Sequence, residues 1–440
     1  MSRVVMFVYN DVTHDTRVLR EAAALHDAGH QVTIMARPRD AGDRVGDELV
    51  QDGIRIVRVP VPHGWRPWWR LACLPVRVPA AARRRMTGRR QERSGGVGPT
   101  GWLVTWRFAV IGWGRRAAEQ APVADIYHGH DLSGMVAAER AATLHEGGLV
   151  YDSHELLLES RSTARQPDWA RSIIRRLEAR MVARADAVVT VNGAIAAELA
   201  RRYRMPRTVI VHNCPPRWSP PEPAPDRIRS ALGIPGDEAI ALYHGGFSAH
   251  RGLEELGEAI LGPGLERVHA VYLGYGAGLA QLQQMAAEPR FGGRVHVLDA
   301  VEPEDLLPWV ASSDVGVIAI QASTLNHRLS TPNKLFECLA AGVPVVASDF
   351  PGMRRIVIDD PDGPLGAVCD PTDPDAIAAA IRGILELEPA ARADLRRRCL
   401  RAAHERWNWE TESATLLALY AELGTAEPGV PALDEPARAG

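Results

Sequence analysis

A single lysine marks a segment that could bind an anion. Lysine and arginine together number 51, and the only lysine among them is Lys334, in the segment STPNKLFECLAAGVPVV. Ser330 or Thr331 is suited to cap a helix that has Pro332 at its first position. Lys334 would then lie at about the third position, where the helix dipole disfavours a cation by about 0.3–1 kcal/mol. A cation kept there predicts a compensating anion, and an ammonium beside free helical N–H groups suits a phosphate.

A carboxylate lies one helical turn after this lysine. Glu337 could accept hydrogen bonds from the two ribose hydroxyls of a nucleotide whose phosphates meet Lys334. The alternative is that the two side chains, three residues apart, pair with each other on a solvated helix face. The lone lysine, the helix start and the position after a strand together favour the nucleotide.

Glycines follow two predicted strands of the second half of the chain. Gly245 and Gly246 end the strand-like segment AIALYHGG and would let the backbone approach a diphosphate closely. The segment GYGAG at 274–278 either lines the pocket for a base or forms an ordinary turn between strand and helix.

The first half of the chain offers a second set of polar residues at predicted strand ends. Open α/β sheets bind ligands at such ends, and the segments YHGHD and YDSHE place His130, His154 and Glu155 there. His154 and Glu155 are candidate acceptor-side groups, although Glu155 could merely cap the next helix. Asp15 and Arg17 open the first helix: Asp15 suits a helix cap, and the alternative is that both face the acceptor or the donor phosphates.

Several of these segments resemble the retaining glycosyltransferases of family 4. The resemblance is carried by TPNKLFECLAAGVPVVASDFPGMRRIV, DTRVLREAAALHDAGHQVTIMA, VYDSHE, ADAVVTVN, YHGGFSAHRGLEEL and DPTDPDAIAAAI. It implies a GT-B fold, in which two Rossmann-like, doubly wound α/β domains face each other and a C-terminal helix crosses back to the first. It also implies transfer of a sugar from a nucleoside diphosphate sugar to a hydroxyl acceptor with retention, and no need for a metal or another cofactor.

The resemblance assigns roles to particular residues. Arg251 matches a basic residue that neutralises the leaving diphosphate, and His130 matches a position that touches the donor sugar or phosphate from across the cleft. Catalysis is thereby expected from His130, Arg251 and Lys334, and donor binding from Gly245, Gly246, Arg251, Asn333, Lys334, Leu335 and Glu337. Glu337 matches the second of two family glutamates, whereas the first falls on Leu329. The donor sugar is therefore expected to meet Asn326, Arg328 or Ser330 instead.

The missing glutamate keeps another class of function open, a catalytically silent nucleotide-sugar-binding or scaffold protein. A nucleotide-sugar epimerase of the same fold is a third alternative, although its motifs are not seen. A dinucleotide oxidoreductase is disfavoured because YNDVTHDTR, and not a G-x-G-x-x-G loop, follows the first strand.

The elements that must position these residues alternate between apolar strands and amphipathic helices in both halves, which is typical of doubly wound α/β domains. We predict a first domain over 1–213, a proline-rich linker over 214–228 and a second domain over 229–400. A crossover helix over 401–424 and a disordered tail over 425–440 complete the chain.

The segment 62–113 interrupts the first domain with ten arginines, six tryptophans and one acidic residue. Its tryptophans either pack on the first domain or, with the arginines, lie on an anionic membrane. The second alternative suggests a lipid-linked acceptor and a cytoplasmic protein at the inner face of a membrane.

Composition excludes several partners. A net charge of −3 argues against a general nucleic-acid binder. Five scattered cysteines without a C-x-x-C pair give no zinc site and fit a reducing cytoplasm. The segment DDPDG at 359–363 is predicted as a turn, because a calcium loop would need a glutamate further on.

Overall fold

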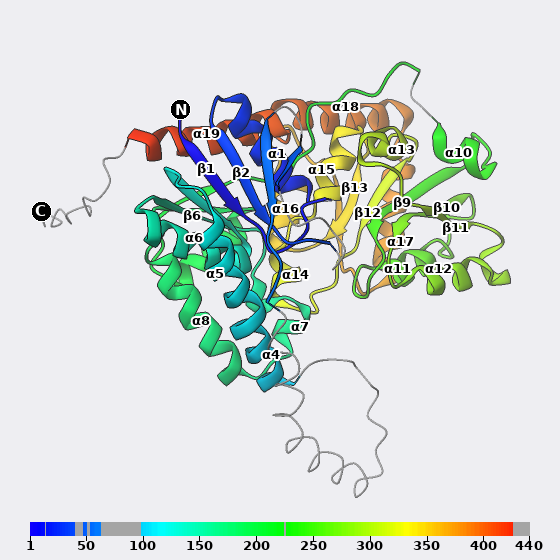
Figure 1. Ribbon diagram of the computed structural model, residues 1–440. Helices are drawn as coiled ribbons and strands as arrows, with labels where there is room; N and C mark the ends of the chain where they lie inside the picture. Colours follow the sequence, from blue (N-terminus) through cyan, green and yellow to red (C-terminus); the bar gives the residue numbers. More distant parts are fainter. Residues whose placement is uncertain (14, 40–46, 51–52, 63–97, 224–225, 426–440) are drawn as a thin grey trace, which may run out of the picture.

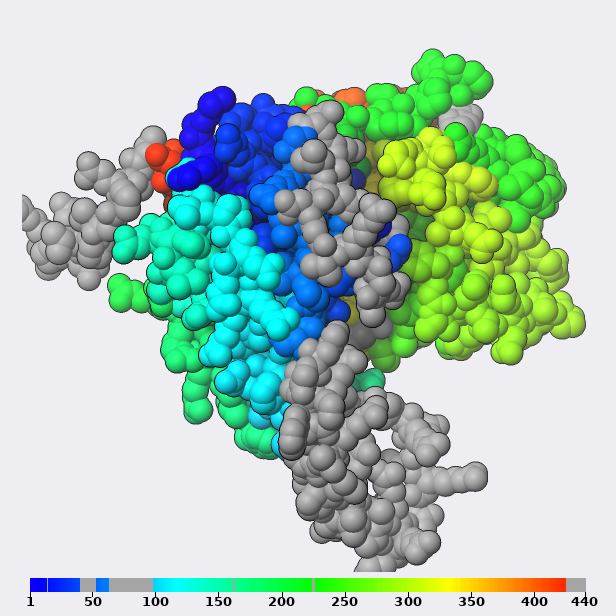
Figure 2. All heavy atoms as spheres, in the orientation of Figure 1, coloured from blue at the N-terminus to red at the C-terminus, as the bar shows by residue number. Residues whose placement is uncertain are grey.

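Two parallel sheets, each covered by helices, make up the part of the chain that the structure describes. The computed structural model describes residues 1–13, 15–39, 47–50, 53–62, 98–223 and 226–425 (Figure 1). Figure 2 shows the two domains side by side, the first coloured blue to cyan-green and the second green to yellow. The predicted pair of Rossmann-like domains is confirmed.

The first domain contains an eight-stranded sheet in the order β3-β4-β2-β1-β5-β6-β7-β8, parallel except for the β3–β4 pair. Its strands are β1 Arg3–Phe7, β2 Gln31–Ala36, β3 Asp47–Val50, β4 Ile54–Arg58, β5 Ile126–His130, β6 Gly148–Ser153, β7 Ala187–Thr190 and β8 Arg207–Ile210. Strand β1 is buried on both faces from Val4 onward, which explains its unbroken apolar sequence. Its helical segments are α1 Thr16–Asp27, α4 Pro99–Thr105, η1 Trp106–Val110, α5 Ile111–Gln120, α6 Asp131–His145, η2 Leu157–Glu159, α7 Arg161–Ala164, α8 Asp168–Val182 and α9 Gly193–Arg202.

The second domain contains a six-stranded parallel sheet in the order β11-β10-β9-β12-β13-β14. Its strands are β9 Ala239–Gly246, β10 Val268–Tyr275, β11 Val295–Asp299, β12 Val315–Ile318, β13 Val345–Ser348 and β14 Gly366–Cys369. Its helical segments are α10 Arg227–Leu232, α11 Leu253–Ala259, α12 Leu279–Ala286, η3 Pro289–Phe291, η4 Pro303–Asp305, α13 Leu306–Val310, α14 Leu325–Leu329, α15 Asn333–Ala340, α16 Pro351–Val357, α17 Pro374–Leu385 and α18 Pro389–Glu405. A single apolar cluster fills this domain on both sides of the sheet.

The C-terminal helix returns to the first domain, as predicted. Helix α19, Trp409–Thr425, packs Leu416, Leu419 and Tyr420 into the core between α1 and the first sheet (Figure 1). The predicted single helix over 401–424 is wrong in detail, because α18 ends at Glu405 before α19 begins. Asn408 causes this break: its Nδ2 donates to the carbonyls of Ala403 and His404, and its Oδ1 accepts from the amide of Thr411. One side chain thus caps both helices.

The arginine- and tryptophan-rich segment is only partly described. Residues 63–97 lie outside the described residues, and so do residues 426–440 of the predicted tail. The described end of the segment is helical and part of the first core: Trp113 is fully buried, its Nε1 donates to the carbonyl of Val59 at 3.0 Å, and Trp106 is buried too. For these two tryptophans the packing alternative is correct. Within the described ranges, no helix is long and apolar enough to cross a membrane.

Candidate active site

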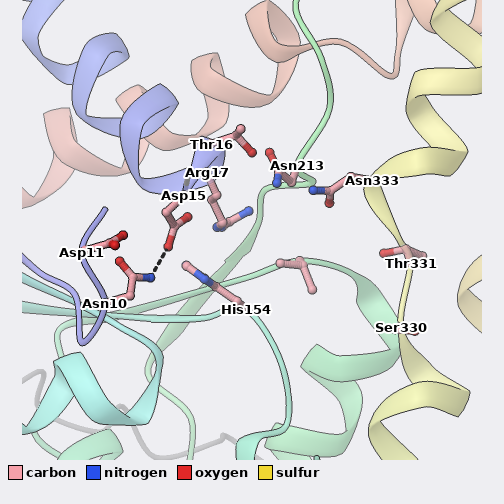
Figure 3. A pocket seen from close by; sticks show the side chains of 11 residues that line it. Asn10, Asp11, Asp15, Thr16, Arg17, His154, Asn213, Ser330, Thr331 and Asn333 are labelled. Atoms are coloured by element: carbon pink, nitrogen blue, oxygen red, sulfur yellow. Dashed lines mark hydrogen bonds between the residues drawn. The ribbon is translucent and has the colours of Figure 1, made fainter. Parts of the chain in front are cut away.

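Two adjoining cavities lie between the domains, at the carboxyl ends of the strands where ligands are expected. The larger cavity, of about 680 Å³, lies mainly on the second domain, and the smaller, of about 490 Å³, lies mainly on the first. Four residues line both cavities: Thr16, His154, Ser330 and Asn333. Figure 3 shows the smaller cavity, with His154 at its floor and Asn333 facing it from the second domain. A ligand in one cavity can therefore meet a ligand in the other.

Lys334 lies at the start of α15 and lines the larger cavity. The helix begins one step later than predicted: Pro332 is the cap, no side chain caps the first turn, and Lys334 occupies the second helical position. Its Nζ lies 4.9 Å from the centre of the Tyr243 ring. Burial and then the charge of Arg251 lower the pKa of Lys334 to about 8. An anion that binds between these two cations would relieve their repulsion.

Glu337 does not pair with the lysine, which removes the alternative considered from the sequence. Its Oε2 lies 2.8 Å from His244 Nε2, at the end of β9. Burial opposes ionisation of Glu337, but the hydrogen bond from His244 and the charges of His244 and Lys334 lower the pKa of its carboxyl. The carboxylate is thus held ionised at the wall of the larger cavity, where it can accept hydrogen bonds.

The absence of a side chain at Gly245 leaves room for the ammonium group of Lys334. The Gly245 φ of 100° suits glycine, and a Cβ there would lie 3.3 Å from Lys334 Nζ. Gly246 is exposed and does not line the cavity, although Arg251 does. The expectation for Leu335 is wrong: its side chain is fully buried in the second core, and its amide donates to the carbonyl of Pro332.

The two first-domain histidines have different environments. His130, expected at the donor, is 1% exposed and lines neither cavity; its Nδ1 lies 3.2 Å from Asp152 Oδ2 and 3.1 Å from His154 Nε2. His154 lines both cavities and lies 2.8 Å from the same Asp152 oxygen. Burial opposes its protonation, but the carboxylates of Asp131 and Asp152 raise the pKa of His154 to about 10. His154 is therefore the histidine that is open to the cavities, and His130 supports it from behind.

Asp15 has the capping role considered from the sequence, and both Asp15 and Arg17 line the smaller cavity. Asp15 caps α1, since its Oδ1 accepts from the amide of Val18 at 3.3 Å, and it also lines the smaller cavity. Arg17 lines that cavity too but is 3% exposed, and its guanidinium donates twice to Asp152 at 2.9 Å and once to the carbonyl of Val211. The guanidinium of Arg17 is thus held by Asp152 and Val211 of the same domain.

A buried group of polar side chains lies behind Arg17. Glu21, His128, His130 and Asp152 each offer one possible metal-ligating atom, all within 4.8 Å of one another. Arg17 Nε lies 3.0 Å from Glu21 Oε1, so the guanidinium supplies the positive charge that a metal would bring. We interpret the group as a buried polar network around the Arg17–Asp152 ion pair, which fixes the strand ends beneath His154.

Helix α14 contacts the first domain, and its last residue, Leu329, is the leucine at the position of the first family glutamate. Leu329 packs against the first core, and its carbonyl accepts from Asn192 Nδ2 at 2.9 Å. Asn326 accepts from the amide of Leu156 at 2.9 Å and donates to Glu155 at 2.8 Å. The backbone that would carry the glutamate is therefore committed to the domain contact. Burial and then the charge of Asp131 raise the pKa of Glu155 to about 7.

Comparison with known protein families shows which family the chain belongs to. Residues 14–214 match the family described as glycosyl transferase 4-like domain, and residues 238–387 match glycosyl transferases group 1. The two matches together span most of the chain. The chain belongs to the group 1 glycosyl transferases. Its relatives include the D-inositol 3-phosphate glycosyltransferase of Xylanimonas cellulosilytica, 31% identical over 57% of this chain and 60% of that protein.

Other similar proteins extend the comparison. The GDP-mannose-dependent alpha-(1-6)-phosphatidylinositol monomannoside mannosyltransferase of Mycolicibacterium smegmatis is 30% identical over 46% of this glycosyl transferase chain and 53% of that protein. The chain thus spans less than two thirds of both curated relatives. The structure of sucrose-phosphate synthase from Thermosynechococcus elongatus aligns with a TM-score of 0.71 at 18% identity, over 97% of this chain and 100% of that one. Anabaena HepE with UDP-glucose aligns with a TM-score of 0.66 at 15% identity, over 96% and 100%. These structures show that the fold is shared.

Several lining residues of this glycosyl transferase were not predicted from its sequence. His244 directly precedes the glycine pair, so its place at a strand end was a usable signal. Arg20 lies one helical turn after Thr16 and donates to Asn213 Oδ1 at 3.0 Å, which brings a further cation to the larger cavity. Asn10 and Asp11, in the loop after β1, line the smaller cavity. No local sequence motif marked them as site residues.

Proposed function

We propose that this protein transfers a sugar from a nucleoside diphosphate sugar to a hydroxyl acceptor, with retention and without a metal. The observation that carries the proposal is the placement of Lys334 beside Arg251 and Gly245 in the larger cavity, with Glu337 one turn further along the same helix. Two cations and an uncapped helix start suit a diphosphate, and an ionised carboxylate nearby suits a ribose diol. Relatives named for GDP-mannose and solved structures named for UDP-glucose support a donor of this class.

In this proposal catalysis is mainly electrostatic. As the bond between the anomeric carbon and the diphosphate oxygen breaks, negative charge grows on the diphosphate and is stabilised by Lys334 and Arg251. The acceptor oxygen then bonds to the anomeric carbon on the same face, and its proton passes to the departing diphosphate. No carboxylate nucleophile is needed in this scheme. His154, at the junction of the cavities, holds its charge close to the reacting atoms.

The finer role that we propose is in the synthesis of a glycolipid, polysaccharide or other glycoconjugate, at the cytoplasmic face of a membrane. A relative named for a phosphatidylinositol monomannoside supports this role. Phe108 (42%), Trp169 (55%) and Ile173 (45%) are among the large apolar side chains exposed on the first domain, and they would suit a membrane interface. Flotation with anionic liposomes tests this part: protein that stays at the bottom of the gradient contradicts it.

A donor panel tests the proposed activity. Nucleoside diphosphate sugars with uracil, guanine and thymine bases are incubated with the full chain, and release of nucleoside diphosphate is measured with and without an acceptor mixture. We expect release from one base class and its loss in Lys334→Ala. Tight nucleotide binding without release from any donor would favour the silent binding protein, for which the absent glutamate at Leu329 is the supporting observation. Conversion of the donor sugar without an acceptor would favour an epimerase.

A further inference from the structure

The smaller cavity differs in charge from the larger one. Its wall carries the carboxylates of Asp11 and Asp15 and the amides of Asn10, Asn213 and Asn333 (Figure 3). The cations Lys334, Arg251 and Arg20 line only the larger cavity. A volume of about 490 Å³ is in the range of small-molecule sites.

The place where a phosphate would most readily bind in the smaller cavity is already occupied by an anion. Helix α1 begins at this cavity, and free N–H groups at a helix start attract phosphate. Here Asp15 takes that position: its Oδ1 accepts from the amide of Val18 at 3.3 Å, and its Oδ2 accepts from Asn10 Nδ2 at 2.8 Å (Figure 3). A second anion would meet the Asp15 carboxylate.

The cations that line the smaller cavity are neutralised by the protein. Arg17 donates to Asp152 and Val211, and His154 lies 2.8 Å from Asp152 and 3.5 Å from Asp131. Arg39, 56% exposed, lies 3.4 Å from Asp11. The charges of Arg17 and His154, the two cations that line the cavity, are thus offset by Asp152 and Asp131 from behind, and the carboxylates of Asp11 and Asp15 face the cavity itself.

We propose that the smaller cavity is the acceptor subsite, and that the acceptor group it takes is a neutral polyhydroxylated ring, a sugar or cyclitol that carries no phosphate. The inference rests on the proposed function, because it assigns the larger cavity to the donor. Carboxylates and amides pair with vicinal hydroxyls, and the four residues shared by the two cavities give one hydroxyl access to the anomeric carbon. Any phosphate of a larger acceptor lies outside this cavity.

Matched acceptor pairs test the proposal on the full chain, with the donor identified by the panel above. The pairs are myo-inositol with myo-inositol 3-phosphate, methyl mannoside with mannose 6-phosphate, and glucose with glucose 6-phosphate; glucosamine adds a cationic arm. Glycoside formation is measured for wild type, Asp11→Asn, Asp15→Asn and the control Asp168→Asn, whose carboxylate is 87% exposed on α8. Asparagine is also a good helix cap, so the Asp15 variant is expected to fold.

We expect wild type to use the neutral member of at least one pair at least tenfold better than its phosphorylated partner. The preference should fall severalfold in Asp11→Asn and Asp15→Asn and remain in Asp168→Asn. Equal or better use of the phosphorylated members, a tenfold preference for glucosamine over glucose, or use of no neutral member would overturn the inference. Stabilisation by nucleoside diphosphate and slow donor hydrolysis, measured in parallel, report on the larger cavity alone. If these persist, the proposed function survives a failure of the acceptor inference; if they are absent, the proposed function itself has failed.

Discussion

The two cavities between the domains show opposite ways of using charge. In the larger cavity Lys334 is buried close to a second cation: burial and then the charge of Arg251 lower the pKa of the lysine. In the smaller cavity each cation is bound to carboxylates, and Asp15 fills the helix start that would otherwise attract an anion. The comparison teaches that a buried cation held close to another cation suits a phosphate, whereas a cation bound to carboxylates supports the surrounding structure. The predictions below separate the two regions.

Removing the lysine should have the largest effect. In Lys334→Ala we expect donor turnover to fall on the order of 10²–10³-fold, the cost of removing one group that stabilises growing negative charge. Stabilisation by nucleoside diphosphate should fall with it. Arg397→Ala, at an arginine 65% exposed on α18, is the matched control and should keep full turnover. Turnover of Lys334→Ala within twofold of wild type would contradict the assignment.

The pH dependence of nucleotide binding should reflect the titration of Lys334. The free protein has a Lys334 pKa of about 8, and a bound diphosphate favours the ammonium. The dissociation constant of the nucleoside diphosphate should therefore be flat between pH 7 and 8 and should rise above pH 8, approaching tenfold per pH unit. Calorimetric titration measures it. Lys334→Arg, whose guanidinium stays charged, and the nucleoside without phosphates should show no such rise.

Restoring the family glutamate at Leu329 should weaken the fold and leave donor binding no tighter. Leu329 packs against the first core, so an ionised side chain there loses apolar burial at the domain contact. We expect Leu329→Glu to lower the free energy of unfolding by about 1–2 kcal/mol, measured in urea, while Leu329→Met stays close to wild type. Tighter nucleotide or donor binding in Leu329→Glu would show that the position does face the donor.

A substitution in the smaller cavity should have the smallest effect on nucleotide binding. Asp15→Asn leaves the larger cavity intact, so its dissociation constant for nucleoside diphosphate should stay within about twofold of wild type. Calorimetry under the same conditions as for the lysine variants checks this. A tenfold change in either direction would mean that the two cavities are not separable.

The sequence predicted best what depends on neighbours along the chain. The strand–helix alternation predicted the fold because each element carries its own periodicity, and Lys334 and Glu337 could be proposed together as nucleotide-binding residues because they share one helix. Two of the expected donor residues are misplaced: Leu335 points into the core, since successive helical residues point in different directions, and Gly246 is exposed and does not line the cavity.

Contacts between distant segments could not be read from the sequence. Which of His130 and His154 faces the ligand depends on how neighbouring strand ends turn, and nothing local distinguishes them. The domain contact joins Asn326 of α14 to Leu156, which lies 170 residues earlier in the chain. The role of α14 in this contact is therefore visible only in the structure. The abundance of arginine in 62–113 likewise gave no sign that Trp106 and Trp113 belong to the core.

The most direct test of the account is an experimental structure of the full chain with the nucleoside diphosphate that binds it. The account predicts that the diphosphate lies within hydrogen-bond distance of Lys334 Nζ and the Arg251 guanidinium, and that the ribose hydroxyls meet the Glu337 carboxylate. A diphosphate bound in the smaller cavity, against Asp11 and Asp15, or a nucleotide without contact to Lys334 would contradict it.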